Sequence, residues 1–96
     1  MFHHIVMLSL REPLSPKDHA EIDAACALML RELPGIVSLR FVRNHSDRSP
    51  AYTHAFVSSF VDEAAHDLYQ QTPLHAPLKQ KVKEITDHLI VLDYET

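Results

Sequence analysis

The first strand-like segment of the chain, residues 2–10, places apolar side chains on both of its faces. Because side chains alternate across a strand, one face holds His4, Val6, Leu8 and Leu10, and the other holds His3, Ile5, Met7 and Ser9. The segment 52–60 has the same property, since neither of its faces holds a charged residue. A strand with one face in water would alternate apolar and polar residues, so these two segments predict a sheet that is covered on both faces.

A helix is predicted after the first strand. Ser15 is a suitable N-cap, Pro16 suits the first helical position, and Asp18 places an acid in the first turn. Apolar side chains then follow at spacings of three and four residues, namely Ile22, Ala25, Cys26, Met29, Leu30 and Leu33. We expect Pro34 and Gly35 to end this helix, with Gly35 in the left-handed conformation.

The remaining segments predict two more strands and two more helices. Residues 36–43 alternate as a strand, with Val37, Leu39 and Phe41 on one side, and a polar turn joins them to 52–60. Residues 62–71 predict a short helix with an inner face of Ala65, Leu68 and Tyr69, which Thr72 and Pro73 end. A helix over 74–86 and a strand over 88–94 complete the chain.

The element order is β-α-β-β-α-β, which is the ferredoxin-like arrangement within the α+β class. It predicts one domain over residues 1–96, with a four-stranded antiparallel sheet and helices on one face. The other face would then expose Ile5, Met7, Ala55 and Val57. A bare apolar sheet on so small a chain predicts a homodimer in which two sheet faces pack together, a dimeric α/β barrel.

Composition excludes several classes of function. Nine Lys and Arg against thirteen Asp and Glu give a net charge of −4, which argues against nucleic-acid binding. No apolar run approaches the length of a membrane span, and the N-terminus lacks the pattern of a signal peptide. With one glycine, Gly35, the chain has no glycine-rich nucleotide-binding loop. Its one cysteine, Cys26, is consistent with a reducing cytoplasm, and we expect its side chain to be a small, buried, apolar group.

Histidines in apolar strands are the candidate functional residues. His4 and His54 lie on faces that are otherwise mainly apolar, and an unpaired buried polar group costs roughly 1–3 kcal/mol. His75 follows a Thr-Pro-Leu break after Tyr69, and the break can aim both side chains at the sheet. If these groups converge, they form an acid/base pocket in which His75 removes a proton and Tyr69 donates a hydrogen bond to an oxygen. The alternative is that each is a hydrogen-bonded core or surface residue.

A metal site is the weaker interpretation of the same residues. His4, His54 and His75 would supply three nitrogen ligands, but no local metal-binding signature is present. We therefore expect neither a metal nor a cofactor. His19 and His66 have the spacing of solvated helix positions.

Five segments, taken together and in order, resemble the stress-responsive α/β-barrel (Dabb) family. They are His4-Ile-Val-Met-Leu, Leu-Pro-Gly-Ile, Tyr52-Thr-His54-Ala-Phe-Val, Tyr69-x-x-Thr-Pro-Leu-His75 and Leu-Ile-Val-Leu-Asp93-Tyr94. The resemblance covers essentially the whole chain and implies a ferredoxin-like protomer in a homodimer. The family includes plant stress proteins and polyketide cyclases that perform a cofactor-free aldol condensation with a Tyr and a His.

By this resemblance, Tyr69 and His75 are the expected catalytic pair, and His4 and His54 the expected substrate-binding residues. Two positions depart from the family pattern: Thr72 stands where His or Asn is more frequent, and Ala25 or Cys26 stands where the cyclases have an aromatic residue. We expect proton-transfer chemistry, such as cyclisation or isomerisation, on a small carbonyl compound. The alternatives are a non-catalytic stress-response or ligand-binding dimer, and a monooxygenase-like or haem-handling protein of the same superfamily.

Overall fold

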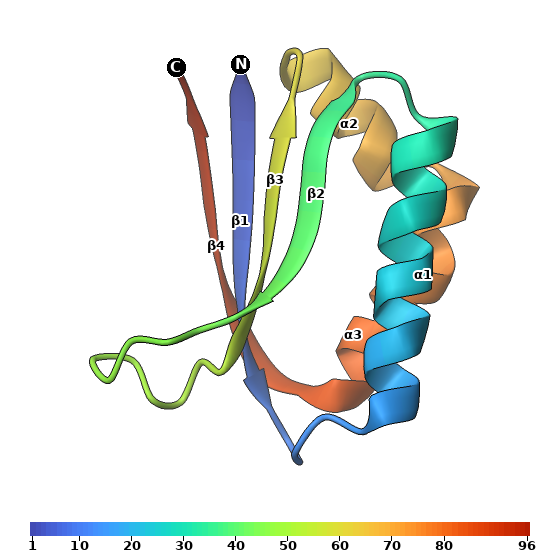
Figure 1. Ribbon diagram of the computed structural model, residues 1–96. Coiled ribbons are helices and arrows are strands. Elements are labelled where there is room, and N and C mark those ends of the chain that lie inside the picture. Colours follow the sequence, from blue (N-terminus) through green and yellow to red (C-terminus); the bar gives the residue numbers. More distant parts are fainter.

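The computed structural model describes residues 1–96 and confirms the predicted ferredoxin-like fold. Strands β1 (Phe2–Leu10), β2 (Ile36–Arg43), β3 (His54–Phe60) and β4 (Thr86–Glu95) form one antiparallel sheet in the order β2-β3-β1-β4. Helices α1 (Pro16–Glu32), α2 (Glu63–Gln71) and α3 (Ala76–Ile85) all lie on one side of this sheet (Figure 1). A 3₁₀ turn, Pro73–His75, joins α2 to α3.

Side-chain caps begin α1 and α2 at the predicted places. The Ser15 hydroxyl accepts a hydrogen bond from the Asp18 amide at 3.0 Å, and the Asp62 carboxylate accepts one from the Ala65 amide at 2.9 Å. These bonds satisfy amides that have no partner within the helix. Strand β4 begins at Thr86, two residues earlier than predicted, because the Thr86 hydroxyl bonds the Val82 carbonyl and ends α3 there.

Gly35 is required for close packing, and the expected left-handed conformation is wrong. No residue of the chain has a positive φ. A Cβ at position 35 would instead lie 2.6 Å from the Cβ of Ala65, which is closer than two non-bonded carbon atoms approach in proteins. The first residues after α1 therefore pack directly against α2, and only a residue without a side chain fits between them.

Two predicted side-chain placements are also wrong. A bulge between Ile36 and Ser38 turns Val37 outward, so Val37 is 51% exposed and Ile36 is buried in its place. In α2, Leu68 is 60% exposed, whereas His66 is buried at 8% exposure. Tyr69 and the Ala65 contact with Gly35 set the inner face of α2, and His66, three residues before Tyr69, shares that face.

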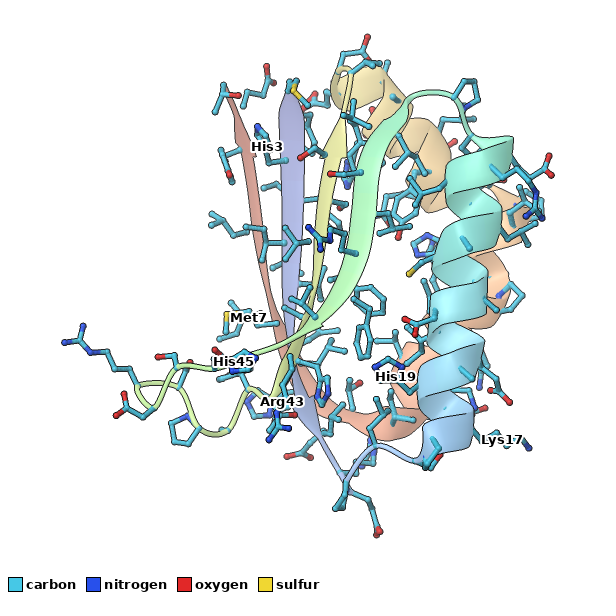
Figure 2. All side chains as sticks on the ribbon, in the orientation of Figure 1. His3, Met7, Lys17, His19, Arg43 and His45 are labelled. Carbon is cyan, nitrogen blue, oxygen red and sulfur yellow. The ribbon has the colours of Figure 1, made fainter.

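The face of the sheet opposite the helices is apolar and uncovered. Met7 projects from β1 on this side (Figure 2). The register places Ile5 opposite both Val57 and Leu92, and Met7 opposite Ile90. Val57, Ile90 and Leu92 are 37%, 50% and 54% exposed. None of the helices combines the length and apolar character of a membrane span.

Candidate functional site

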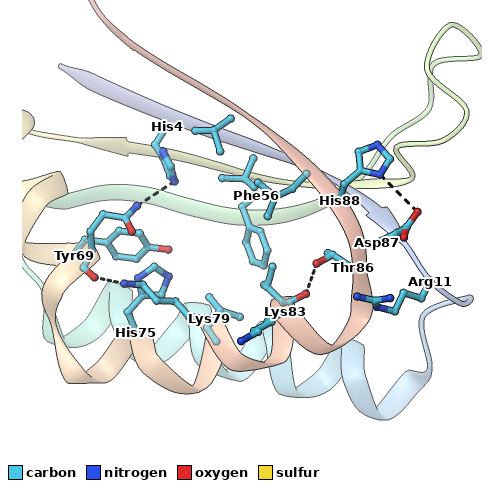
Figure 3. Close-up of a pocket in the computed structure, with 16 residues that line it drawn as sticks. His4, Arg11, Phe56, Tyr69, His75, Lys79, Lys83, Thr86, Asp87 and His88 are labelled. Atoms are coloured by element: carbon cyan, nitrogen blue, oxygen red, sulfur yellow. Dashed lines mark hydrogen bonds and ion pairs between the residues drawn. The ribbon is translucent and has the colours of Figure 1, made fainter.

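A cavity of about 520 Å³ lies between the sheet and helices α2 and α3 (Figure 3). One end is lined by His4, Tyr69 and His75, and charged residues of α3 and β4 lie toward the other. The middle is apolar and is formed by Val6, Phe56, Leu78, Val82, Leu89 and Val91. An apolar pocket with a few polar groups at one end is the usual form of a small-molecule site.

His75 is buried at the inner end of this cavity. The Thr72 hydroxyl accepts a hydrogen bond from the Leu74 amide at 3.4 Å, which helps to form the 3₁₀ turn that holds His75 beneath Tyr69. The two rings lie 4.1 Å apart between centroids. Nδ1 of His75 is the one buried side-chain nitrogen or oxygen of the chain without a hydrogen-bond partner. Native proteins rarely leave such an atom unpaired, which makes His75 a candidate for a functional role.

Burial controls the ionisation of this pair. Burial, and then the charge of Lys79, lowers the pKa of His75 to about 4, while the nearby Tyr69 backbone carbonyl acts in the opposite direction. The imidazole is therefore neutral at pH 7 and has a free lone pair. Burial raises the pKa of Tyr69, so its phenol stays protonated and can donate a hydrogen bond.

His4 is held in a defined orientation by its neighbours. The register pairs His4 of β1 with Asp93 of β4, and Nδ1 of His4 donates a hydrogen bond to the Asp93 carboxylate. On the other side of the ring, the Gln70 amide lies 3.4 Å from Nε2. An Nδ1 donor leaves Nε2 as an acceptor, so the carboxylate and the amide favour the same tautomer.

His66 belongs to this cluster, and its prediction as a solvated residue is wrong. Its ring lies 4.6 Å from the rings of both Phe2 and His4, and its Nε2 lies 3.2 Å from the Gln70 amide nitrogen. Burial, and then the His4 imidazole, lowers its pKa, while Asp93 raises it. The spacing of three residues between His66 and Tyr69 was the signal in the sequence, because it places both on one helical face.

His54 does not join the other three residues. It shares the inner face of the sheet, but the register places it opposite Leu8 rather than His4. Four residues along a strand correspond to about 13 Å. Its ring stacks on Phe41 at 5.2 Å and lines a second cavity of about 510 Å³ with His19 and Arg43. Burial, and then the charges of His19 and Arg43, lowers its pKa. The expected proximity of His4 and His54 is therefore wrong.

The residues that could hold a metal ion are His4, His66 and Asp93, whose ligand atoms lie within 4.8 Å of one another. Two imidazoles and one carboxylate are a donor set that divalent transition metals accept. These atoms already bond one another or Gln70, so the cluster satisfies its own polar groups. The set of His4, His54 and His75, which the sequence offered as metal ligands, does not converge.

Cys26 is buried, and burial raises the pKa of its thiol to about 11.

Comparisons with known proteins agree with this fold. A family model described as "Stress responsive A/B Barrel Domain" matches residues 2–96. A comparison with curated proteins finds no match. Among solved structures, a dimeric ferredoxin-like protein of unknown function from Jannaschia sp. is 27% identical, with a TM-score of 0.88 and coverage of 99% of this chain and 98% of the other.

Two similar structures belong to enzymes. Hydroxynitrile lyase from Passiflora edulis is 22% identical, with a TM-score of 0.81 and coverage of 97% of this chain and 90% of the other. SnoaB from Streptomyces nogalater, a cofactor-independent oxygenase, is 12% identical, with a TM-score of 0.76 and coverage of 99% and 91%. At these identities the likeness concerns the fold alone.

Proposed function

The chain belongs to the stress-responsive A/B barrel (Dabb) family, and on that premise we propose that it performs cofactor-free acid/base chemistry on a small carbonyl compound. The observation that supports this most directly is the unpaired, buried Nδ1 of His75 beside the Tyr69 ring, at the end of an apolar cavity. A neutral imidazole that lacks a partner and lies against a protonated phenol is suited to take a proton while the phenol stabilises an oxygen.

In the proposed reaction, His75 removes a proton from the carbon next to the substrate carbonyl. The electron pair of that C–H bond forms the enolate double bond, and the carbonyl π electrons move to the oxygen. Tyr69 donates a hydrogen bond to this oxygen, where the negative charge develops. The enolate then attacks a second carbonyl of the same molecule, which closes a ring, and the alkoxide that forms takes the proton from His75. If the enolate is conjugated with a further carbon–carbon double bond, it instead accepts the proton from His75 at the far carbon of that bond, which isomerises the substrate.

His4 is the proposed substrate-orienting residue, because it lines the same cavity and Asp93 and Gln70 hold its ring. His54 has no part in this proposal, since it lines the separate cavity beside Phe41. The bond to Asp93 fixes the tautomer of His4, so a substrate that displaced the Gln70 amide would meet Nε2 as a hydrogen-bond acceptor.

We also propose that the protein is a homodimer formed through the uncovered sheet faces. The exposed apolar residues Val57, Ile90 and Leu92 support this, because so large an apolar surface is unfavourable in water. Several of the similar structures are described as dimeric, including the protein from Jannaschia sp..

The buried free thiol of Cys26 supports a cytoplasmic location, where thiols stay reduced.

The low pKa of His75 supports a second candidate, a non-catalytic dimer that binds a small ligand. A base with a pKa of about 4 has a weaker driving force for removing a proton than one whose pKa is near 7. The monooxygenase-like or haem-handling alternative stays a prediction, because the likeness to SnoaB does not extend beyond the fold.

Exchange of substrate protons for deuterium tests the proposal. We expect the protein to accelerate exchange of the α-protons of phenylacetone or benzylacetone in D₂O, measured by proton NMR. His75→Asn should reduce the enzymatic rate by about 10²-fold or more, and Tyr69→Phe by a similar factor. His45→Asn, in an exposed loop, is the matched control and should keep the wild-type rate. Binding of the ketones without any acceleration would favour the second candidate.

A further inference from the structure

The cavity is lined by cations that have no carboxylate partner. Arg11 and Lys83 lie toward the outer end with a single acidic residue, Asp87. The Lys79 ammonium instead lies near His75 and donates a hydrogen bond to the Gln70 carbonyl. None of the three cations lies within 4.0 Å of a carboxylate oxygen. Lys81 of the same helix differs, since it pairs with Asp18 at 3.0 Å and Glu21 at 2.7 Å and lies outside the cavity. The cluster is a local positive region on a chain whose net charge is −4.

The cations extend in a row from the reactive end. His75, Lys79 and Lys83 follow one another at spacings of four residues along the turn and α3, so their side chains share one face of the helix. Eight residues of helix span about 12 Å. Figure 3 shows His75 and Tyr69 at one end of the pocket, Phe56 in its middle, and Lys83 and Arg11 toward the other end.

Apolar side chains fill the interval between the two ends, and some of them are not covered. Leu89 and Val91 lie on the helix-facing side of β4, opposite Leu8 and Val6. They are nevertheless 42% and 48% exposed, because they face the cavity rather than a helix. An apolar chain placed in the cavity would remove this surface from water, which is favourable in proportion to the area buried.

We propose that the pocket selects an elongated apolar molecule with an anionic group at one end. The anion binds Arg11 and Lys83 at the mouth, and the opposite end of the molecule reaches His75 and Tyr69. Arginine binds carboxylate and phosphate groups through paired hydrogen bonds, so either anion satisfies this chemistry. The inference rests on the proposed function, in that it names the substrate class of the same pocket.

Calorimetry with three probes of equal chain length tests the proposal. Octanoate and octyl phosphate provide the two anions, and octanamide is their neutral counterpart. At low ionic strength we expect at least one anion to bind about tenfold more tightly than octanamide, and the advantage to shrink as salt is added. The better anion identifies the preferred group.

Variants that remove charge test whether the preference for the anionic probe arises from Arg11 and Lys83 at the mouth of the cavity. The double variant Arg11→Gln/Lys83→Gln should lose the preference for the anion and keep its affinity for octanamide. Lys17→Gln/Arg48→Gln removes the same charge at two exposed positions outside the cavity, one at the start of α1 (Figure 2) and one in the loop before β3. This control should keep the wild-type preference.

Three results would overturn the inference. They are equal affinity for octanamide and both anions at low salt, an unchanged preference in the double variant, and no binding of any probe. The deuterium-exchange experiment can fail without affecting these outcomes, because probe binding requires no proton transfer. Failure of the inference and failure of the proposed function are therefore distinguishable.

Discussion

The buried imidazole of His75 should make the stability of the protein depend on pH in a defined range. An imidazole in the unfolded chain has a pKa near 6.5, and burial lowers that of His75 to about 4. Each pKa unit corresponds to about 1.4 kcal/mol, so the difference is worth about 3 kcal/mol per protomer. Between these two pKa values the unfolded chain binds a proton that the folded chain does not. The free energy of unfolding should therefore rise as the pH increases from 4 to 6.5, and this contribution should be lost as the pH falls again.

Urea denaturation followed by circular dichroism, at a series of pH values from 4 to 7.5, measures this dependence. Burial also lowers the pKa of His54 and of His66, so the wild-type slope contains contributions from these residues. The contribution of His75 is the difference in slope between the wild-type protein and His75→Asn, at one fixed protein concentration. His45→Asn, in an exposed loop, should leave the slope unchanged. If His75→Asn retains the full wild-type slope between pH 4 and 6.5, the argument from burial is refuted.

Two further predictions concern packing and assembly. Gly35→Ala should lower the free energy of unfolding by about 1–3 kcal/mol, because its Cβ would lie 2.6 Å from that of Ala65. A double-mutant cycle with Ala65→Gly, measured by urea denaturation, checks the cause: strictly additive effects would contradict the clash. Val57→Asp should yield a monomer or insoluble protein in light scattering, whereas Leu68→Asp, an exposed position on α2, should keep the wild-type assembly. An unchanged dimer with Val57→Asp would show that this face of the sheet is not the interface.

The sequence predicts the elements of this fold well because their signals are local. The apolar segment of β1, the Ser15 cap and the Thr72-Pro73 break each act within a few residues, and all appear where they were expected. Val37 could not be placed correctly, since the bulge beside it depends on how β2 pairs with β3. A pattern that alternates strictly along one strand contains no information about a bulge.

The candidate site shows the same division between local and long-range information. The alternation of β1 and β3 correctly places His4 and His54 on the helix-facing side of the sheet, but alternation does not fix register. In the observed register, His4 lies opposite Ser58 and Asp93, and His54 lies opposite Leu8. Which histidines meet is therefore decided by pairings between segments that are far apart in the chain.

Strand β4 links the pocket to the proposed dimer. It is an edge strand that pairs only with β1, and its side chains contribute to both faces of the sheet. Leu89 and Val91 line the pocket on one side, while Ile90 and Leu92 are exposed on the other. Because β4 is held mainly by its pairing with β1 and is exposed on both faces, a partner sheet packed on its outer face would stabilise the pocket wall on its inner face. Because Asp93 of the same strand holds His4, loss of the partner would affect the orientation of a pocket residue as well as the assembly.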